Sequence, residues 1–506
     1  MLTHGRHTTY TMLEKQSIKN PAKEFLVFGN ESYSYAKMYQ RVNQLARWFE
    51  QKGIRKGDTV AGFLSNSPLF YETWFACGAI GAILLPVNTA ATASELDYFL
   101  EHSESKGFLY EPDLINDMHI ETANQKDLVF CQQNDADWYK ELSSLSNEKI
   151  TCDVSPDDVA GIMYTSGTTA KPKGVLITHE NYLFAGHSSI LYQQLNSDDR
   201  YLIFLPLFHV NSQYYTSMAM LICGGTIVLE KRFSSSTFWD TVEKHKPTVT
   251  SMVATTIKML LEKPEHPAEA TNSLRQAGYG LFVTTPNLQA FQQRFDIKLF
   301  QWYGLTESVT TNIVTPLYED MAVDPETGIS AIGKPALGHQ VRILDEEGNE
   351  LPPNQVGQIV VAGPSLMKGY YKNPEATAQT LQNGWLFTGD NGYANEDGFI
   401  WFVDRNKDMI KRAGENISSI EIENILSSHP AIQACAVVGE PDPLREEAVI
   451  AYVKLYEGKE VEAEELHEFC AKDLSYFKVP QEFRFIDDFP RTSIGKIQKN
   501  LLRGNP

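Results

Sequence analysis

The sequence predicts an α/β fold whose large N-terminal part consists of helix-covered, mainly parallel sheets. Helical and strand patterns alternate over residues 34–110, and β-α-β-α-β order is typical of a parallel sheet covered by helices. From about residue 325 the chain turns to short β segments among Gly, Pro and Asp, which indicates a smaller antiparallel β unit. A compact α+β pattern follows after Asp404 and predicts a small C-terminal domain.

Apolar spacing and capping residues define the individual elements. Ser34 can cap a helix whose apolar residues recur every three or four positions until Gly53. The polar residues 112–157 predict an irregular surface excursion. Strands are expected at 58–64, 82–87, 107–110, 175–177, 200–205, 225–229, 248–253, 298–300, 341–344, 358–361, 399–402, 433–438 and 448–455, and helices at 69–79, 94–102, 238–245, 418–428 and 462–472.

Length and composition are those of a multidomain enzyme. The 506 residues are too many for one core, so about three or four domain-sized units are expected. A net charge of −20 argues against nucleic-acid binding, and an anionic cofactor then needs local lysines and arginines. Without a run of 18 apolar residues or an apolar leader, we expect no transmembrane segment and a cytoplasmic protein. The six scattered cysteines lack metal-ligand spacing, so no metal cluster is expected.

Residues 164–174 carry the strongest chemical signal. They read Tyr-Thr-Ser-Gly-Thr-Thr-Ala-Lys-Pro-Lys-Gly. The hydroxyls can donate hydrogen bonds, the glycines let backbone approach a ligand, and the lysines add positive charge, a set that suits a polyphosphate. The spacing is not that of a P-loop. The alternative for this segment is a Ser/Thr/Gly surface turn.

Five further segments combine aromatic and polar residues. Each has a structural alternative on its own, such as a helix cap for Thr306 or a turn for Gly389-Asp390. The segments are Leu205–His209, Gln301–Glu307, Trp385–Asp390, Phe402–Asn416 and Pro490–Lys496. In this order, and together with residues 164–174, they resemble the acyl-activating, adenylate-forming superfamily of acyl-CoA synthetases, peptide-synthetase adenylation domains and luciferases. The resemblance covers almost the whole chain.

The resemblance implies roles for the residues that match nucleotide-binding positions. Tyr303 would stack on adenine, and Asp390 and Arg405 would reach the ribose. Thr306 and Glu307 would lie near the α-phosphate, and Glu307 would hold Mg²⁺. The loop around the β- and γ-phosphates of ATP would consist of Thr165, Ser166, Gly167, Thr168, Thr169 and Lys173.

The resemblance also implies two domains that move during the reaction. The large domain would span residues 1–404, and the small mobile domain 405–506 would swing about a hinge near Lys407. His209 would form a gate between the nucleotide and acyl pockets, and Lys496 would bridge the attacking carboxylate and the α-phosphate. The loop with Gly414 would line the pantetheine tunnel of coenzyme A.

The implied activity is that of an ATP-dependent acid–CoA ligase. A carboxylic acid attacks ATP to form an acyl-adenylate and pyrophosphate, and CoA then displaces AMP. Because the reacting groups repel each other, Mg²⁺, Lys173 and Lys496 are expected to act by charge and positioning. The expected partners are a small carboxylic acid, ATP and CoA, and a homodimer is a compatible assembly.

A nearer resemblance is to crotonobetaine/carnitine-CoA ligases. It is carried by residues 173–179, Asn181, 184–186, 402–405, 409–412, 414–416, Glu421, 423–424 and 477–480. Ala170 stands where the superfamily has Gly, and the segment Tyr279–Thr284 replaces its usual Gly-Gly-Ala-Pro. The acyl pocket is expected at 211–215, 253–256, 280–283 and Trp302. Within it, Tyr214, Tyr215, Phe282 and Trp302 can cage a trimethylammonium group by cation–π contact.

The sequence leaves the substrate open between a crotonobetaine/carnitine-type acid and a fatty acid, because the four aromatic residues can equally form core or an apolar acyl tunnel. Two other activities also remain open. The acceptor can be a carrier-protein thiol in place of CoA, or the chain can be a non-catalytic nucleotide- or acyl-binding relative. A non-catalytic relative is disfavoured, because the chain retains the residues implied in nucleotide binding and catalysis, namely Lys173, Glu307, Asp390, Arg405 and Lys496.

Overall fold

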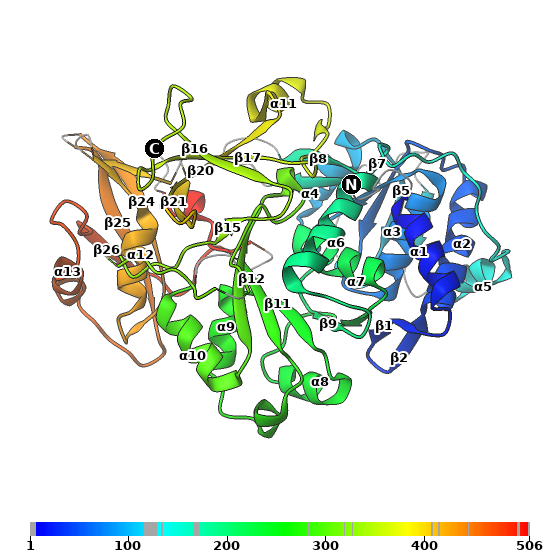
Figure 1. Cartoon of the computed structure of the whole chain (residues 1–506), viewed down its shortest axis with the longest axis horizontal. Helices are drawn as coiled ribbons and strands as arrows, with labels where there is room; N and C mark the ends of the chain where they lie inside the picture. The colour runs from blue at the N-terminus through cyan, green and yellow to red at the C-terminus, as the bar shows by residue number, and fades with distance from the viewer. Residues whose placement is uncertain are drawn as a thin grey trace.

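The computed structural model describes residues 7–115, 129–132, 135–165, 172–280, 283–317, 319–325, 327–405, 408–412, 415–443, 445–492 and 496–503. In Figure 1 the N-terminal elements (blue) and the C-terminal elements (orange) lie at opposite sides of the molecule. The middle of the chain (green) lies between and below them.

One large sheet contains the strands predicted from the β-α-β-α-β pattern. Its order is β18-β8-β7-β4-β3-β5-β6. Strand β3 pairs in parallel with β4 and β5, whereas β7 and β8 form an antiparallel hairpin. The strands are β3 (Thr59–Phe63), β4 (Ile83–Pro86), β5 (Ser105–Tyr110), β6 (Val129–Gln132), β7 (Val159–Thr165), β8 (Lys173–Thr178) and β18 (Gly369–Tyr370).

A second large sheet follows the order β15-β14-β13-β12-β11-β9-β10-β1-β2. Its central strands are parallel, and antiparallel strands close both ends. The strands are β1 (Glu24–Phe28), β2 (Glu31–Ser34), β9 (Arg200–Ile203), β10 (Thr226–Leu229), β11 (Val249–Val253), β12 (Gln276–Gly280), β13 (Lys298–Tyr303), β14 (Ile313–Val314) and β15 (Lys334–Pro335).

Helices cover both large sheets. Ser34 caps the second helix by accepting a hydrogen bond from Lys37 N, as its sequence position predicts. The third helix is apolar on all sides, and every residue of Leu69–Ile80 is buried. The helices are α1 (Thr9–Lys19), α2 (Tyr35–Gln51), α3 (Pro68–Ile80), α4 (Ala93–His102), α5 (Ala136–Ser144), α6 (His179–Gln193), α7 (Met218–Cys223), α8 (Phe238–His245), α9 (Ala254–Leu261) and α10 (Thr285–Phe295).

The predicted antiparallel unit is present as a third sheet. Its strands pair antiparallel throughout, and its core contains Ile343, Ile359 and Leu386. The elements are β16 (Gln340–Leu344), β17 (Gly357–Ala362), α11 (Pro374–Thr380), β19 (Leu381–Gln382), β20 (Trp385–Ala394) and β21 (Ile400–Arg405).

The C-terminal part of the chain has a sheet and an apolar core of its own. The elements are β22 (Ile410–Arg412), β23 (Glu415–Ile417), α12 (Ser419–Ser427), β24 (Ile432–Asp442), β25 (Glu446–Leu455), α13 (Ala463–Ala471) and β26 (Glu482–Phe485). The predicted fold class is therefore confirmed, whereas the domain boundary at residues 404 and 405 stays a prediction.

Several elements of the structure were not predicted from the sequence. Residues 112–157 are not only an irregular excursion, because they contain β6 and α5. Trp138 of α5 packs edge-on against Trp48 of α2, with ring centroids 5.8 Å apart, so a few apolar residues in a polar stretch are enough to dock a helix. The N-terminal elements α1, β1 and β2 were also not predicted, and neither were helices α6, α7, α9 and α10.

Candidate active site

Several predicted site segments lie at one edge of the second large sheet. Strands β9, β11, β12 and β13 are neighbours and parallel, so their carboxyl ends lie together. Ligands of open α/β sheets bind at this edge. The segments that follow the strands are 205–209, 253–256, 280–284 and 303–307, of which residues 281–282, including Phe282, lie outside the described residues.

Asp390 contacts the two other residues that are predicted to hold the nucleoside. It pairs with Arg405 across strands β20 and β21. Tyr303 donates a hydrogen bond from its hydroxyl to Asp390 Oδ2 at 2.7 Å, and Arg405 Nε lies 3.4 Å from Asp390 Oδ1. Burial, and then the adjacent Asp390 carboxylate, raise the pKa of Tyr303 well above its ordinary value, so the phenol remains a donor. Gly389, at φ 72°, supplies the left-handed turn that precedes Asp390.

Glu307 and Lys173 are brought together through an aromatic side chain that the sequence analysis did not single out. Tyr370 donates a hydrogen bond to Glu307 Oε1 at 2.8 Å, and Lys173 Nζ lies 4.3 Å from the centroid of the Tyr370 ring. No local pattern pointed to Tyr370, because Glu307 is 63 positions away in the sequence. The preceding residue of the same segment, Thr306, begins a 3₁₀ turn, Thr306–Ser308.

The predicted phosphate loop connects β7 to β8. Thr165 and Lys173 are paired across this hairpin, and Thr165 Oγ1 donates to Lys173 O at 3.5 Å. Ser166, Gly167, Thr168 and Thr169 lie outside the described residues. The hairpin therefore positions both ends of the loop close to Tyr370 and Glu307.

His209 lies in a segment braced by hydrogen bonds to buried side chains. Asn66 accepts from Leu207 N at 2.8 Å and donates to Leu205 O at 3.0 Å. Burial lowers the pKa of His209 to about 4, so its imidazole is neutral near pH 7. A π-helical turn, Asn211–Ser217, follows directly, and π-helical turns often occur at functional sites.

The predicted aromatic cage is only partly assembled. Tyr215 and Trp302 lie against each other, with ring centroids 5.3 Å apart. Tyr214 instead belongs to the core, because it is fully buried, packs edge-on against Tyr182 and donates its hydroxyl to Met163 Sδ. Gly278 makes room for the pair, since a Cβ there would lie 2.5 Å from the Trp302 ring.

Lys496 lies on a hairpin at the end of the C-terminal part. Arg491 and Ile497 form a β-bridge, and Thr492 N donates to Lys496 O at 2.7 Å. This part of the chain touches α9, which follows β11 at the carboxyl edge: Lys258 donates to Gln433 O, and Tyr456 donates to Glu262 Oε1 at 2.9 Å. Lys407 and Gly414 lie outside the described residues.

A buried ionic cluster anchors the segment just beyond Lys496. Lys499 Nζ lies 2.7 Å from Glu423 Oε1 and donates to Ser419 Oγ at 2.6 Å. Ser419 in turn donates from its hydroxyl and its backbone N to Asp404 Oδ2. The cluster links the end of β21 to α12 and to the C-terminal turn, and it was not predicted from the sequence.

A lone carboxylate suits the metal that the superfamily implies. No group of three or more His, Cys, Asp or Glu side chains able to hold a metal ion occurs in the described parts of the chain. Mg²⁺ is usually held by one or two carboxylates together with phosphate oxygens and waters, and Glu307 fits that pattern.

Among the residues that the structure describes, no helix has the length and apolar character needed to cross a membrane.

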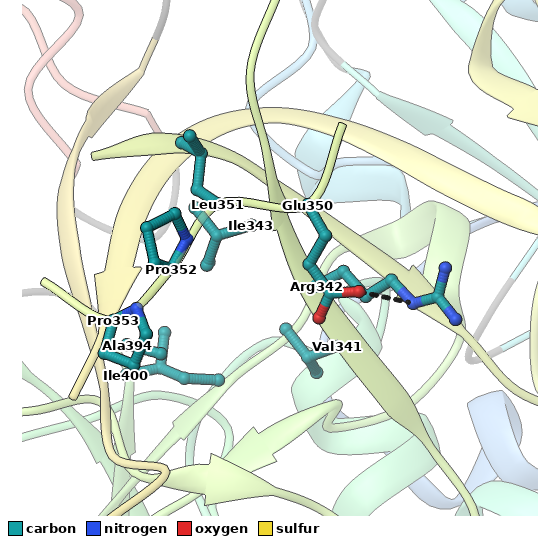
Figure 2. Close-up of a pocket in the computed structure, with 9 residues that line it drawn as sticks. All are labelled: Val341, Arg342, Ile343, Glu350, Leu351, Pro352, Pro353, Ala394 and Ile400. Atoms are coloured by element: carbon teal, nitrogen blue, oxygen red, sulfur yellow. Dashed lines mark ion pairs between the residues drawn. The ribbon is translucent and has the colours of Figure 1, made fainter. Parts of the chain in front are cut away.

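A separate small pocket lies in the third sheet. Figure 2 shows it between β16, the following turn and the ends of β20 and β21, with the ion pair between Arg342 and Glu350 at its side. Its volume is about 180 Å³, and its lining includes none of the predicted site residues.

Comparison with known families and relatives covers nearly the whole chain. The profile of the AMP-binding enzyme family matches residues 13–371, and that of the AMP-binding enzyme C-terminal domain matches residues 421–496. The crotonobetaine/carnitine–CoA ligase of Citrobacter koseri is 38% identical over 488 residues, 93% of each chain. The protein of the same name from Proteus mirabilis is 36% identical over 491 residues, again 93% of each chain.

Solved structures agree with the sequence comparison. ATP-bound MatB from Rhodopseudomonas palustris has a TM-score of 0.89 at 28% identity and covers 98% of both chains. O-succinylbenzoate coenzyme A synthetase (MenE) from Bacillus subtilis, in complex with ATP and magnesium ion, has a TM-score of 0.86 at 31% identity and covers 97% of this chain and 98% of its own. The chain therefore belongs to the AMP-binding enzyme family, as an adenylate-forming CoA ligase.

Proposed function

We propose that the chain joins a small carboxylic acid carrying a quaternary ammonium group to coenzyme A, with cleavage of ATP to AMP and pyrophosphate. The observation that carries this proposal is the pair of Tyr215 and Trp302, whose rings lie 5.3 Å apart near the carboxyl edge of the second large sheet. Two relatives at 36–38% identity are named crotonobetaine/carnitine–CoA ligases, which supports the same class of acid.

Asp390, Arg405 and Tyr303 hold the nucleoside in this proposal. The Asp390 carboxylate is only 4% exposed, and its two oxygens already meet Tyr303 and Arg405. A carboxylate fixed in this way accepts hydrogen bonds from two ribose hydroxyls without reorganising. The tyrosine ring forms the adjoining wall for adenine.

Lys173 and the loop that precedes it bind the β- and γ-phosphates. Glu307 would hold Mg²⁺, which supplies positive charge against the phosphate oxygens when it is bound. Tyr370 fixes the Glu307 carboxylate by the hydrogen bond at 2.8 Å and lies beneath the Lys173 ammonium. The Lys173 ammonium thus lies over the face of the Tyr370 ring, and the Glu307 carboxylate accepts from the hydroxyl at its edge.

The reaction proceeds in two steps at one site. A carboxylate oxygen of the acid bonds to the α-phosphorus while the bond to pyrophosphate breaks, and Lys496 neutralises the two approaching anions. The thiolate sulfur of CoA then bonds to the acyl carbon, and the bond to AMP breaks. The small domain 405–506 turns about Lys407 between the steps, which withdraws Lys496 and brings the Gly414 loop to the site.

Neutral His209 suits a gate beside a cationic substrate. With a pKa lowered by burial to about 4, its imidazole adds no positive charge that would repel a quaternary ammonium group at pH 7. An ammonium over two partly desolvated rings gains up to about 2 kcal/mol per contact.

A fatty acid is the second candidate substrate. Tyr215 and Trp302 are only 4% and 5% exposed, and two buried rings also form a good wall for an apolar chain. In that case each added methylene contributes about 0.8 kcal/mol to binding, and a cation is rejected for its desolvation cost.

The cytoplasmic location and the homodimer stay predictions.

A matched pair of acids tests the charge preference. γ-Butyrobetaine and 5,5-dimethylhexanoate differ by N⁺ in place of carbon, and the proposal predicts a higher kcat/KM for the former. Trp302→Leu should lower kcat/KM for the cationic acid by up to tens-fold and affect its isostere less. Trp138→Leu, a tryptophan change on α5 away from this edge, is the control. Equal losses for both acids in Trp302→Leu, or faster turnover of the neutral acid, would refute the proposal.

A pyrophosphate-release screen extends the test to the acceptor. The acids are carnitine, crotonobetaine, γ-butyrobetaine and fatty acids of two to sixteen carbons, each with and without CoA. Turnover that is sustained only with CoA supports free CoA as the acceptor. One burst of pyrophosphate without turnover in the presence of CoA would favour a carrier-protein thiol.

A further inference from the structure

One face of helix α4 contacts both strands of the hairpin that carries Lys173. Tyr98 and His102 lie four positions apart on α4, so they share a face of the helix, and their rings are stacked with centroids 5.2 Å apart. Tyr98 donates from its hydroxyl to Pro172 O at 2.9 Å, and His102 Nδ1 lies 2.7 Å from the Tyr164 hydroxyl. The helix therefore meets β7 at one point and the residue directly before β8 at another.

The hydrogen bond from Tyr98 acts on the backbone of Lys173. The carbonyl group of Pro172 and the backbone nitrogen of Lys173 belong to one planar peptide group, so a donor on that carbonyl sets the orientation of the whole plane. In the hairpin register Lys173 also pairs with Thr165. The Lys173 side chain thus leaves a backbone that is held from two directions, and its ammonium lies 4.3 Å from the centroid of the Tyr370 ring.

Helix α4 is a firm support for the Tyr98 hydroxyl. Its N-cap Thr92 accepts from Glu95 N, and the Glu95 carboxylate accepts from Thr92 N in return. Leu96 and Leu100 are buried and dock the helix. Burial raises the pKa of Tyr98, so the phenol remains a donor near pH 7. Side chains on docked helices hold a geometry more precisely than side chains on loops.

The other neighbour of β8 in the sheet is β18, and it is linked to the same face of α4. Tyr371 N, directly after β18, donates to Gly174 O at 2.7 Å. The His102 ring meets the Tyr371 ring edge-on, with centroids 5.7 Å apart, and Lys372 Nζ donates to His102 O at 3.1 Å. The bond from Tyr98 therefore belongs to a connected set of contacts around the start of β8.

We propose that Tyr98 is a positioning residue for ATP, whose hydroxyl orients the Lys173 backbone so that the ammonium meets the β- and γ-phosphates. A lysine side chain loses much rotamer freedom when it binds, and a backbone fixed in advance lowers the total cost of ordering. The hydroxyl then contributes to ATP affinity without contacting the nucleotide. This inference rests on the proposed function for the phosphate contact of Lys173, and it is independent of the acid substrate.

A single hydroxyl deletion tests the role. Tyr98→Phe keeps the ring that stacks on His102. By isothermal titration calorimetry, the Kd of α,β-methylene-ATP should rise about three- to tenfold, the range for one neutral hydrogen bond, whereas the Kd of AMP, which has no β- or γ-phosphate, should stay within twofold. No change in either Kd, or an equal rise in both, overturns the inference.

Tyr35→Phe is the matched control. The Tyr35 hydroxyl also donates to a backbone carbonyl, Gly225 O at 2.7 Å, but this bond joins α2 to the residue before β10 in the second large sheet. The variant should leave both Kd values within twofold of the wild type. A selective loss of α,β-methylene-ATP affinity in Tyr35→Phe as well would overturn the assignment to Tyr98.

A double-mutant cycle with Lys173→Ala distinguishes positioning from a general effect on the fold. If Tyr98 acts through the Lys173 ammonium, the two changes are coupled. Tyr98→Phe should then alter the Kd of α,β-methylene-ATP by less than twofold once the ammonium is absent. An equally large loss with and without the Lys173 side chain would show that Tyr98 acts by another route, and would overturn the inference.

The same titrations separate this role from the proposed function. If Lys173→Ala weakens α,β-methylene-ATP and Tyr98→Phe does not, the role of Tyr98 fails and the phosphate contact of Lys173 stands. If Lys173→Ala leaves the Kd of the analogue unchanged, the phosphate contact itself fails, and the role of Tyr98 fails with it.

Discussion

Asp390 is the residue at which the third sheet meets the carboxyl edge of the second. It receives Tyr303 from β13 and Arg405 from β21, and Thr388 fixes its backbone by accepting from Asp390 N at 3.1 Å. Under the proposed function, a carboxylate held by two side chains on a fixed backbone binds the ribose in the same way whichever phosphates follow. Its loss is therefore expected to affect all adenine nucleotides.

Asp390→Ala should weaken ATP and AMP equally. A charge-assisted hydrogen bond is worth about 1.5–3 kcal/mol, so the Kd of each nucleotide should rise roughly ten- to a hundredfold. Isothermal titration calorimetry with AMP and with a non-hydrolysable ATP analogue measures both. A loss confined to ATP would show that Asp390 does not contact the ribose.

Lys173→Ala should separate the two nucleotides. Its ammonium lies over Tyr370 on the hairpin that leads into the predicted phosphate loop, and AMP has no β- or γ-phosphate for it to bind. The Kd of the ATP analogue should rise at least tenfold while that of AMP stays within twofold, if the lysine forms a charge-assisted bond. Parallel losses in both titrations would mean that the phosphate loop lies elsewhere.

At the scale of elements, a buried histidine joins the N-terminal helix to α6. His179 is fully buried, and its Nδ1 meets Thr9 N at 3.3 Å and Thr9 Oγ1 at 3.1 Å. Burial lowers its pKa to about 4, against a smaller opposing effect of the Asp158 carboxylate. At a pH below about 6.5, the ordinary pKa of histidine, His179 therefore gains a proton in the unfolded chain but not in the folded chain.

Stability should therefore fall as the pH drops from about 6.5 toward 4. For this one group the loss between pH 7 and pH 5 is about 2 kcal/mol. Chemical denaturation of His179→Asn, which keeps an acceptor for Thr9, should show a shallower decline over that range than the wild type. The exposed His467→Asn is the control. The same slope in wild type and His179→Asn would show that the histidine is protonated in the folded state.

The sequence was sufficient for elements with a strong local pattern. Helix α8 begins and ends at the predicted residues, and the bounds of α3 lie within one residue of those expected. Helix α5 was not predicted, because only two of its residues, Trp138 and Leu142, are buried. Two apolar positions are too few to show a helical periodicity. Strands β1 and β2 depend on pairing with β10 and with each other, contacts that no local window contains.

The site was predictable where it depends on residue types in sequence and unpredictable where it depends on contacts. Asp390, Arg405 and Tyr303 were all expected, and they meet in the structure. Tyr370 was not, because a tyrosine that lies under a lysine is visible only once distant strands are assembled. Tyr214 was a candidate for the cage, with the core as the alternative, and the π-helical turn directs it into the core.

At the scale of the whole molecule, the C-terminal part docks on α9. Lys258 donates to Gln433 O and also lies over the Tyr456 ring, while Tyr456 donates to Glu262. Burial, with a smaller effect of the Arg491 charge, lowers the pKa of Lys258. The hairpin that carries Arg491 and Lys496 thus lies near a helix that starts at the carboxyl edge, because the Arg491 charge acts on Lys258.

Lys496→Ala should slow the first half-reaction and spare the second. Formation of the acyl-adenylate loses the cation shared by the two reacting anions and should fall by several orders of magnitude. Single-turnover transfer from a supplied acyl-adenylate to CoA should remain close to wild type, since the lysine has moved away. Lys407→Pro, which restricts φ at the predicted hinge, should do the reverse. Equal losses in both half-reactions of Lys496→Ala would contradict the two-orientation account.

The central claim is tested most directly by letting two acids compete for one enzyme. Equal concentrations of crotonobetaine and octanoate are supplied with ATP, Mg²⁺ and CoA, and both acyl-CoA products are quantified by mass spectrometry at early times. The account predicts crotonobetainyl-CoA in at least tenfold excess, because two aromatic rings discriminate for the cation by about that factor. A predominance of octanoyl-CoA would contradict it.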